Sequence, residues 1–179
     1  MVALKDIELR LISELMKNSR RSDRELAKTL GVSQPTVSRT IQRLEKEGKI
    51  REYTIVPDFT KIGLGLLTIT FVKYKSDLTS EKRAEAMDTI KERAGEASSP
   101  EAVMIERGIG FGYDTVVVSY VKDYSDYVRL LNRIRTYEHV QPDELKDFIV
   151  DLNDKVHFRP FTYSTLAKYL SSTQKEKKE

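Results

Sequence analysis

The segment from Ser22 to Gly48 is predicted to form two short helices separated by a single tight turn. Ser22 and Glu25 have the spacing of a capping box, in which each side chain bonds the backbone N–H of the other residue. Gly31 can adopt the left-handed conformation that ends a helix, and Ser33 can then cap the next one. Two helices joined by a turn of about four residues are typical of a helix-turn-helix.

The residues on either side of this segment complete a small domain. Apolar residues recur at helical spacing over residues 4–17, which predicts a first amphipathic helix. Residues 50–56 are rich in β-branched and aromatic types and are followed by Pro57, so they predict a strand or a small hairpin. We therefore assign residues 1–57 to a winged helix-turn-helix domain that binds DNA.

The second helix of the pair carries an apolar stripe and a basic arc. At about 100° per residue, Val37, Ile41 and Leu44 fall on one side of the helix and are expected to be buried. The opposite arc contains no acidic residue and carries the side chains of Pro35, Arg39, Gln42, Arg43 and Lys46. The helix is therefore basic where it is most exposed.

An exposed basic helix of this kind has the chemistry needed to read DNA. The major groove accepts a helix, and Arg and Gln can bond bidentately to guanine and adenine, respectively. The polar first turn and the basic residues that flank the helix pair are suited to phosphate contacts. We expect the DNA-binding residues to be Arg21, Ser33, Gln34, Pro35, Thr36, Ser38, Arg39, Gln42, Arg43, Lys46 and Arg51. The alternative interpretation is a solvated helix that carries polar residues for solubility.

The charge distribution supports the DNA-binding interpretation. Of the formal net charge of +3, residues 1–60 contribute 12 Lys and Arg less 9 Asp and Glu, whereas residues 61–179 contain 19 of each. The absence of cysteine excludes disulfides and thiolate zinc sites, and the two histidines are too few for a typical imidazole metal centre. We therefore expect no metal or other cofactor. The sequence shows no signal peptide and no membrane span, which predicts a cytoplasmic protein without a membrane partner.

Residues 66–170 are predicted to form a second domain. Amphipathic helical patterns occur at 80–94 and after Asp123, and strand patterns occur at 66–72, 101–106, 114–121 and 145–152. The resulting order, β-α-β-β-α-β, is that of a ferredoxin-like fold, so the chain belongs to the α+β class. We assign residues 58–65 to a linker and residues 171–179, which have nothing to bury, to a disordered tail.

Five short segments, four in the first domain and one where the second domain begins, together resemble a known protein family. They read DIELRLISEL (6–15), RELAKTLGVS (24–33), TVSRTIQRLEKEG (36–48), IREYT (50–54) and KIGLGL (61–66). Together they resemble the Lrp/AsnC family of prokaryotic transcription regulators. The resemblance implies that the protein binds double-stranded DNA as a homodimer or higher homo-oligomer. It also implies that the βαββαβ domain dimerises and binds an amino-acid effector.

The resemblance further suggests where an effector would bind. In the family, a Gly-x-x-Asp-like turn between the second and third strands helps to form the effector site, and the equivalent place here is occupied by Gly110, Gly112, Tyr113 and Asp114. Asp114 could pair with an α-amino group, while a plain hairpin turn is the alternative. The long first crossover, 76–100, and the extension at 153–170 depart from the family pattern. The aromatic residues of the extension either cover the sheet or join a subunit interface.

Three hypotheses about function follow, in decreasing order of preference. The first is a dimeric, sequence-specific transcription regulator, and the second is an architectural DNA-compacting protein with little sequence preference. The third is an enzyme built on the second domain, with Glu106, Asp114, His139 and His157 as candidate residues. These four show no triad, metal-ligand or phosphate-loop spacing, so we do not expect an enzyme.

Overall fold

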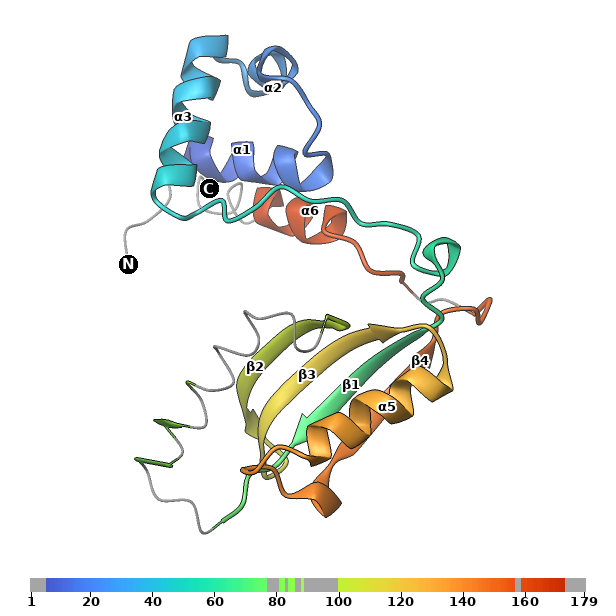
Figure 1. Cartoon of the computed structure of the whole chain (residues 1–179). Coiled ribbons are helices and arrows are strands. Elements are labelled where there is room, and N and C mark those ends of the chain that lie inside the picture. Colours follow the sequence, from blue (N-terminus) through green and yellow to red (C-terminus); the bar gives the residue numbers. More distant parts are fainter. Residues whose placement is uncertain are drawn as a thin grey trace. The chain divides into compact units, whose positions relative to one another are not determined.

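The computed structural model describes residues 6–76, 81–82, 84–85, 88, 100–156 and 159–172 (Figure 1). The chain divides into two compact units. Met1–Pro57 and Phe158–Glu179 form the first unit, and Asp58–His157 forms the second. The chain therefore leaves the first unit after Pro57 and returns to it near its C-terminal end.

The first unit begins with three helices that share one apolar core. Helix α1 spans Asp6–Lys17, α2 spans Asp23–Leu30 and α3 spans Gln34–Lys46. Each helix contributes a fully buried leucine to the core: Leu11, Leu26 and Leu44. Complete burial of one such side chain contributes about 1.5–3 kcal/mol. The core therefore fixes which side of α3 faces inward.

The ends of these helices are set by the contacts that the sequence predicts. The Ser22 Oγ accepts from the Glu25 N–H at 3.3 Å, and the Glu25 Oε2 accepts from the Ser22 N–H at 2.7 Å. Gly31 and Gly48 have φ angles of 71° and 66°, in the left-handed region that favours glycine. The capping box and both glycine stops are confirmed.

A fourth helix, α6 (Ser164–Ser172), packs against α1 although it lies at the other end of the chain (Figure 1). The buried Ser13 Oγ of α1 donates to the Ala167 carbonyl at 2.8 Å, and Ala167 has no exposed surface. These two small residues allow the helices to approach closely. The sequence predicts residues 158–170 to be part of the second domain, whereas Phe158–Glu179 belong to the first unit, in which α6 packs on α1.

The end of α6 also differs from the sequence analysis. Ser171 and Ser172, expected to begin a disordered tail, are the last two residues of the helix. The Ser171 Oγ lies 2.7 Å from the Ser13 Oγ and donates to the Ala167 carbonyl at 3.0 Å. These contacts extend α6 beyond the predicted boundary. The rest of the predicted tail, 173–179, lies outside the described residues.

Residues 50–56 form neither a strand nor a hairpin, so the prediction of a β-element there is wrong. Three hydrogen bonds attach the segment to the rest of the first unit, and in the first the Ile50 N–H donates to the Leu44 carbonyl at 3.2 Å. The Tyr53 hydroxyl donates to the Glu45 Oε1 at 2.8 Å, and the Ser19 hydroxyl donates to the Thr54 carbonyl at 3.2 Å. A strand needs a neighbouring strand to complete its backbone hydrogen bonds. The described part of the first unit contains no such neighbour.

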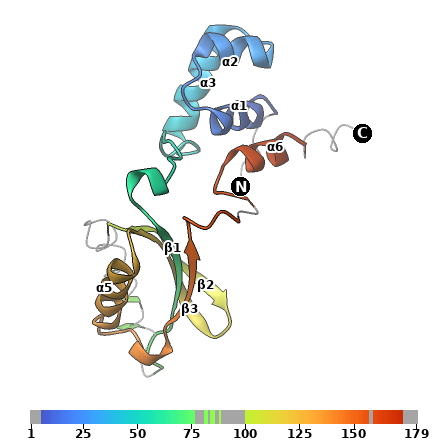
Figure 2. The same ribbon diagram turned by 90° about the vertical axis from the view of Figure 1, so that its right-hand side faces the viewer.

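The second unit is a four-stranded antiparallel sheet with the strand order β2-β3-β1-β4 (Figures 1 and 2). The strands are β1 Leu66–Val72, β2 Ala102–Gly110, β3 Tyr113–Val121 and β4 Lys146–Asp151. Helix α5, Tyr124–Arg135, begins at the Asp123 cap and covers one face of the sheet. This topology confirms the α+β class and the ferredoxin-like arrangement. The helix predicted at 80–94 lies mostly outside the described residues.

The segment assigned to a linker, 58–65, packs on the second unit. It contains a short 3-10 helix, η1 (Thr60–Ile62). The Phe59 ring stacks on Tyr120 of β3 with ring centroids 3.9 Å apart. The Gly65 N–H donates to the Lys122 carbonyl at 3.1 Å, and a β-carbon at Gly65 would lie only 2.6 Å from that same oxygen. Glycine is therefore required where this segment joins β1.

The two faces of the sheet differ in what covers them. Side chains of β1 and β3 such as Val72 and Val117 form the core beneath α5. The intervening side chains point to the opposite face, where the register places Ile69 beside Val118 and Phe148. Phe148 is 63% exposed. The face that α5 does not cover therefore carries an apolar patch.

Two features that would indicate other functions are absent from the residues that the structure describes. No helix among them combines the length and the apolar composition needed to cross a membrane. No group of three or more His, Cys, Asp or Glu side chains among them is placed to hold a metal ion.

Ala167→Leu is expected to destabilise the first unit by about 1–3 kcal/mol, because the added atoms have no room between α6 and α1. Lys168→Leu introduces the same side chain at the exposed neighbouring position and should change stability by less than about 0.5 kcal/mol. Urea unfolding followed by circular dichroism measures both. Equal stability of the two variants would show that α6 does not pack on α1 in solution.

Candidate nucleic-acid interface

Helix α3 has one packed side and one open side. Val37 and Leu44 are 1% and 0% exposed, and Ile41 is half-buried against the same core. Thr40 is also buried, and its hydroxyl donates to the Thr36 carbonyl at 2.7 Å. The exposed side chains of the helix include Gln34, Pro35, Thr36, Arg39, Gln42, Arg43 and Lys46. The predicted apolar stripe and outward arc are both present in the structure.

The first turn of α3 is organised by its cap. The Ser33 Oγ accepts from the Thr36 N–H at 3.3 Å and lies 2.7 Å from the Thr36 Oγ1. The two hydroxyls thus bond to one another while both residues remain exposed. A hydroxyl has one donor and two acceptor positions, so each still has capacity for a phosphate or a base edge. Ser38, by contrast, is half-buried.

Arg43 belongs to an ion-pair network that links α3 to α1. Its Nη2 donates to the Oε1 of Glu8, whose side chain is only 4% exposed. The Lys49 Nζ lies 3.7 Å from the other oxygen of Glu8 and 2.7 Å from the Glu47 Oε2. Glu47 also approaches the Arg43 Nε at 3.9 Å. Hydrogen bonding to Glu47, followed by the charges of Glu47 and Glu8, raises the pKa of Lys49.

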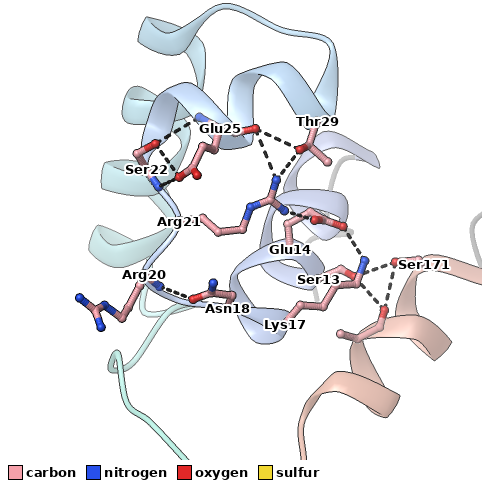
Figure 3. A network of polar contacts seen from close by, with 11 residues as sticks. Ser13, Glu14, Lys17, Asn18, Arg20, Arg21, Ser22, Glu25, Thr29 and Ser171 are labelled. Carbon is pink, nitrogen blue, oxygen red and sulfur yellow. Dashed lines mark hydrogen bonds and ion pairs between the residues drawn. The ribbon is translucent and has the colours of Figure 1, made fainter.

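Arg21 is likewise engaged within the first unit (Figure 3). Its guanidinium donates to the Glu14 carboxylate of α1 and to the Thr29 hydroxyl of α2. Lys17 pairs with the same carboxylate. Burial acts to raise the pKa of Glu14, but the bonds and charges of Lys17 and Arg21 outweigh it, and the net pKa is lowered. Arg21 therefore joins α1 to α2, whereas the adjacent Arg20 side chain points away from this network (Figure 3).

Three cations of the predicted DNA-binding set make no ion pair with any described residue: Arg39, Lys46 and Arg51. The same is true of Arg20, which lies just before α2. Arg39 and Lys46 lie on the open side of α3, together with Gln42. The residue that sequence reasoning missed is Glu8, which restrains Arg43. The helical spacing could have indicated its burial. Glu8 lies three residues before Leu11 and seven before Leu15, so it is on the side of α1 that faces the core.

The extended segment after α3 is fixed against the end of that helix. Burial, together with the hydrogen bond to Glu45 and the Glu45 charge, raises the pKa of Tyr53 to about 12. The hydroxyl is therefore protonated near neutral pH and remains a donor to Glu45. This contact holds the segment that carries the exposed Arg51.

The glycine-rich stretch of the second unit is a tight hairpin between β2 and β3. Phe111 and Gly112 have φ angles of 52° and 79°, and positive φ at both central residues is typical of a type I′ turn. The strand β2 continues through Gly108 to Gly110, beyond the predicted end at 106. The Asp114 Oδ2 accepts from the Tyr74 N–H at 2.9 Å. This geometry is that of a plain hairpin turn, the alternative to an effector site.

Aromatic side chains surround this hairpin. The Phe71 ring lies 6.4 Å from the Phe111 ring and 5.8 Å from the Tyr113 ring, measured between centroids. Phe111 itself is 92% exposed at the tip of the turn. The four residues assigned to an effector site, Gly110, Gly112, Tyr113 and Asp114, therefore lie together beside an apolar cluster. Of these, Asp114 already has a backbone partner.

Comparison with known proteins places the chain among transcription regulators. A family of winged helix-turn-helix DNA-binding domains matches residues 4–51. The HTH-type transcriptional regulator PH0061 of Pyrococcus horikoshii is 30% identical over 139 residues, which cover 75% of this chain and 87% of that protein. The crystal structure of PH0061 superposes with a TM-score of 0.71 at 26% identity, over 90% of this chain and 99% of that one.

Two further structures share the fold. An AsnC family transcriptional regulator from Agrobacterium tumefaciens has a TM-score of 0.70 at 19% identity, over 89% of this chain and 94% of that one. The transcriptional regulator NMB0573 of Neisseria meningitidis, solved as a complex with L-Met, has a TM-score of 0.71 at 18% identity, over 90% and 96% of the two chains. The relative and the three structures are similar to this chain over both of its units.

Proposed function

Because the chain belongs to the Lrp/AsnC family of DNA-binding transcription regulators, we propose that it recognises its operator through Arg39 and Gln42 of α3. The observation that carries this proposal is the position of both side chains. They are three residues apart on the exposed side of a helix whose other side is fixed by the core. Arg39 bonds bidentately to a guanine and Gln42 to an adenine in the major groove.

The other polar residues of the first unit place the helix on the duplex. Lys46, Arg51 and Arg20 neutralise phosphates, since none is paired with an acid among the described residues. The first turn of α3 contributes hydroxyl and backbone N–H contacts through Ser33, Gln34, Pro35, Thr36 and Ser38. Arg21 supports the site by joining α1 to α2, and Arg43 contributes the part of its guanidinium that Glu8 leaves exposed.

Arg39→Ala is expected to weaken operator binding by about 1–3 kcal/mol, because it removes one bidentate base contact. The operator is first selected as bound fragments from genomic DNA, and its affinity is then measured by fluorescence anisotropy. Arg135→Ala, an exposed arginine of the second unit, serves as the control and should leave the affinity unchanged.

The same titrations separate this proposal from an architectural role in DNA compaction. A sequence-specific regulator prefers its operator over unrelated DNA by about 10³-fold or more at physiological salt. Failure of the unaltered protein to prefer any fragment would support the architectural alternative. If the Arg39→Ala variant binds the selected operator with unchanged affinity, Arg39 does not contact a base.

We further propose that two copies of the chain associate through the open face of the sheet. One short helix reads only a few base pairs, and two copies spaced about 34 Å apart read a pseudo-palindrome. The face opposite α5 carries Ile69, Val118 and the 63% exposed Phe148. Exposed apolar faces of this kind indicate association sites.

Phe148→Lys is expected to shift the protein from dimer, or larger oligomer, to monomer, because the charge would be buried without a partner in the interface. Tyr124→Lys is the matched control, since Tyr124 is 66% exposed on α5. Sedimentation velocity gives the masses of both variants. A dimer that persists in Phe148→Lys would place the interface elsewhere.

For the effector, we propose an amino acid bound at Gly110, Gly112, Tyr113 and Asp114. The support is the carboxylate of Asp114 next to the aromatic cluster of Phe71, Phe111 and Tyr113. The carboxylate pairs with an α-amino group, and the rings contact an apolar side chain. The NMB0573 protein, solved with L-Met, shows that this fold can hold such a ligand.

Asp114→Asn is expected to abolish the thermal stabilisation that an apolar L-amino acid such as methionine gives the unaltered protein, because the amide carries no charge for the ammonium group. Differential scanning fluorimetry with the D-enantiomer as control measures the effect. Equal responses of the variant and the unaltered protein would move the effector away from this turn, and no response in either would leave the hairpin without a ligand role.

A further inference from the structure

The ion-pair network at Glu8 lowers the positive charge that the first unit can offer to DNA phosphates. The network joins two acids, Glu8 and Glu47, to two cations, Arg43 and Lys49. Its formal charge sums to zero. A surface that is basic by sequence therefore has two of its cations neutralised inside the protein, at the C-terminal half of α3 and just after it.

The burial of Glu8 makes this neutralisation durable. The Glu8 side chain is 4% exposed, whereas those of Arg43 and Lys49 are 43% and 24% exposed. If the two cations moved to phosphates, the buried Glu8 carboxylate would lose two of its charge partners. Removing a charge partner from a buried carboxylate costs more free energy than a single surface ion pair returns. The pairs with Glu8 should therefore persist when the protein meets DNA.

We propose that Glu8 is a specificity-determining residue, because it withholds Arg43 and Lys49 from the phosphate backbone. Phosphate contacts supply essentially all of the affinity for unrelated DNA. Together with Glu47, Glu8 neutralises the two cations next to the reading helix, which lowers that affinity and leaves discrimination to the base contacts of α3. This inference rests on the proposed recognition of an operator by α3.

Glu8 also fixes the direction of the Arg43 side chain. One Nη of the guanidinium is bound to Glu8, and the Nε faces Glu47 at 3.9 Å. The exposed remainder of the planar group is held in one orientation, which suits a directional contact with a base edge rather than a mobile contact with phosphates. Glu8 is thus a positioning residue that acts on DNA through Arg43 and Lys49.

The test is the salt dependence of binding to unrelated DNA. The logarithm of the affinity falls with the logarithm of the salt concentration by about 0.9 for each phosphate neutralised. Glu8→Gln should steepen this slope by about 0.9 per protomer, since Arg43 is released while Lys49 keeps its partner Glu47 at 2.7 Å. The ratio of operator affinity to unrelated-DNA affinity should fall by roughly three- to ten-fold at physiological salt.

Matched variants separate this effect from a general gain of charge. Glu101→Gln adds the same single unit to the formal net charge of +3 and releases Arg133, its partner at 2.6 Å in the second unit. It should leave the slope unchanged. The double variant Glu8→Gln with Arg43→Gln should lose about 0.9 of the added slope. Urea unfolding identifies any variant that fails to fold.

Arg43→Gln alone gives an answer that does not require the buried substitution. Under the proposal Arg43 does not neutralise a phosphate, so this variant should bind unrelated DNA with an unchanged slope. A slope flattened by about 0.9 would mean that Arg43 contacts phosphates in the unaltered protein, and the inference would be overturned. A Glu8→Gln slope equal to that of the unaltered protein would overturn it as well.

The outcomes also distinguish this inference from the proposed function. If the unaltered protein prefers no fragment of genomic DNA, the recognition by α3 fails and the specificity ratio has no meaning. If it prefers an operator while the slopes of Glu8→Gln and Arg43→Gln contradict the expectations above, recognition stands. In that case Glu8 has only a structural role.

Discussion

The apolar contact between α3 and the two preceding helices determines the direction of every polar side chain on α3. Val37 and Leu44 are buried against Leu11 and Leu26, so the helix cannot rotate about its axis without exposing them to water. Arg39 and Gln42 consequently face outward whatever their own contacts are. The hydrophobic effect, which has no directional preference, thereby creates a directional polar surface.

Polar contacts then refine this surface by assigning different tasks to residues of the same type. Arg21, Arg39 and Arg43 are all arginines that the sequence places near DNA. Arg21 joins α1 to α2, Arg43 is held by a buried carboxylate, and Arg39 makes no ion pair with any residue of known placement. Composition alone treats the three as equivalent. What makes them different is the presence or absence of an acidic partner on α1, Glu14 for Arg21 and Glu8 for Arg43.

Much of the fold was predictable because its signals are local. The capping box at Ser22, the stops at Gly31 and Gly48 and the apolar stripe of α3 all depend on residues within one turn of one another. Alternating and β-branched patterns likewise predicted the strands of the sheet. The outward arc of α3 followed from the same periodicity, so most of the candidate site was predictable as well.

The features that the sequence did not predict depend on contacts between distant segments. Nothing near Ser13 indicates that its hydroxyl bonds to Ala167, which is 154 residues away. The pairing of Glu8 with Arg43 spans 35 residues. Residues 50–56 have strand-like composition, but composition cannot supply the neighbouring strand that pairing requires. In each case the deciding partner lies outside the range that a local pattern covers.

The contact between α6 and α1 has a consequence for synthesis. During translation the helix-turn-helix leaves the ribosome first, whereas the helix that covers α1 is made only after the whole second unit. Until then the buried Ser13 hydroxyl lacks its partners, and the surface around it stays open to water or to other chains. The DNA-binding unit therefore becomes complete only after the second unit has been synthesised, so a chain cut before α6 would carry the reading helix on a domain that lacks one of its packed helices.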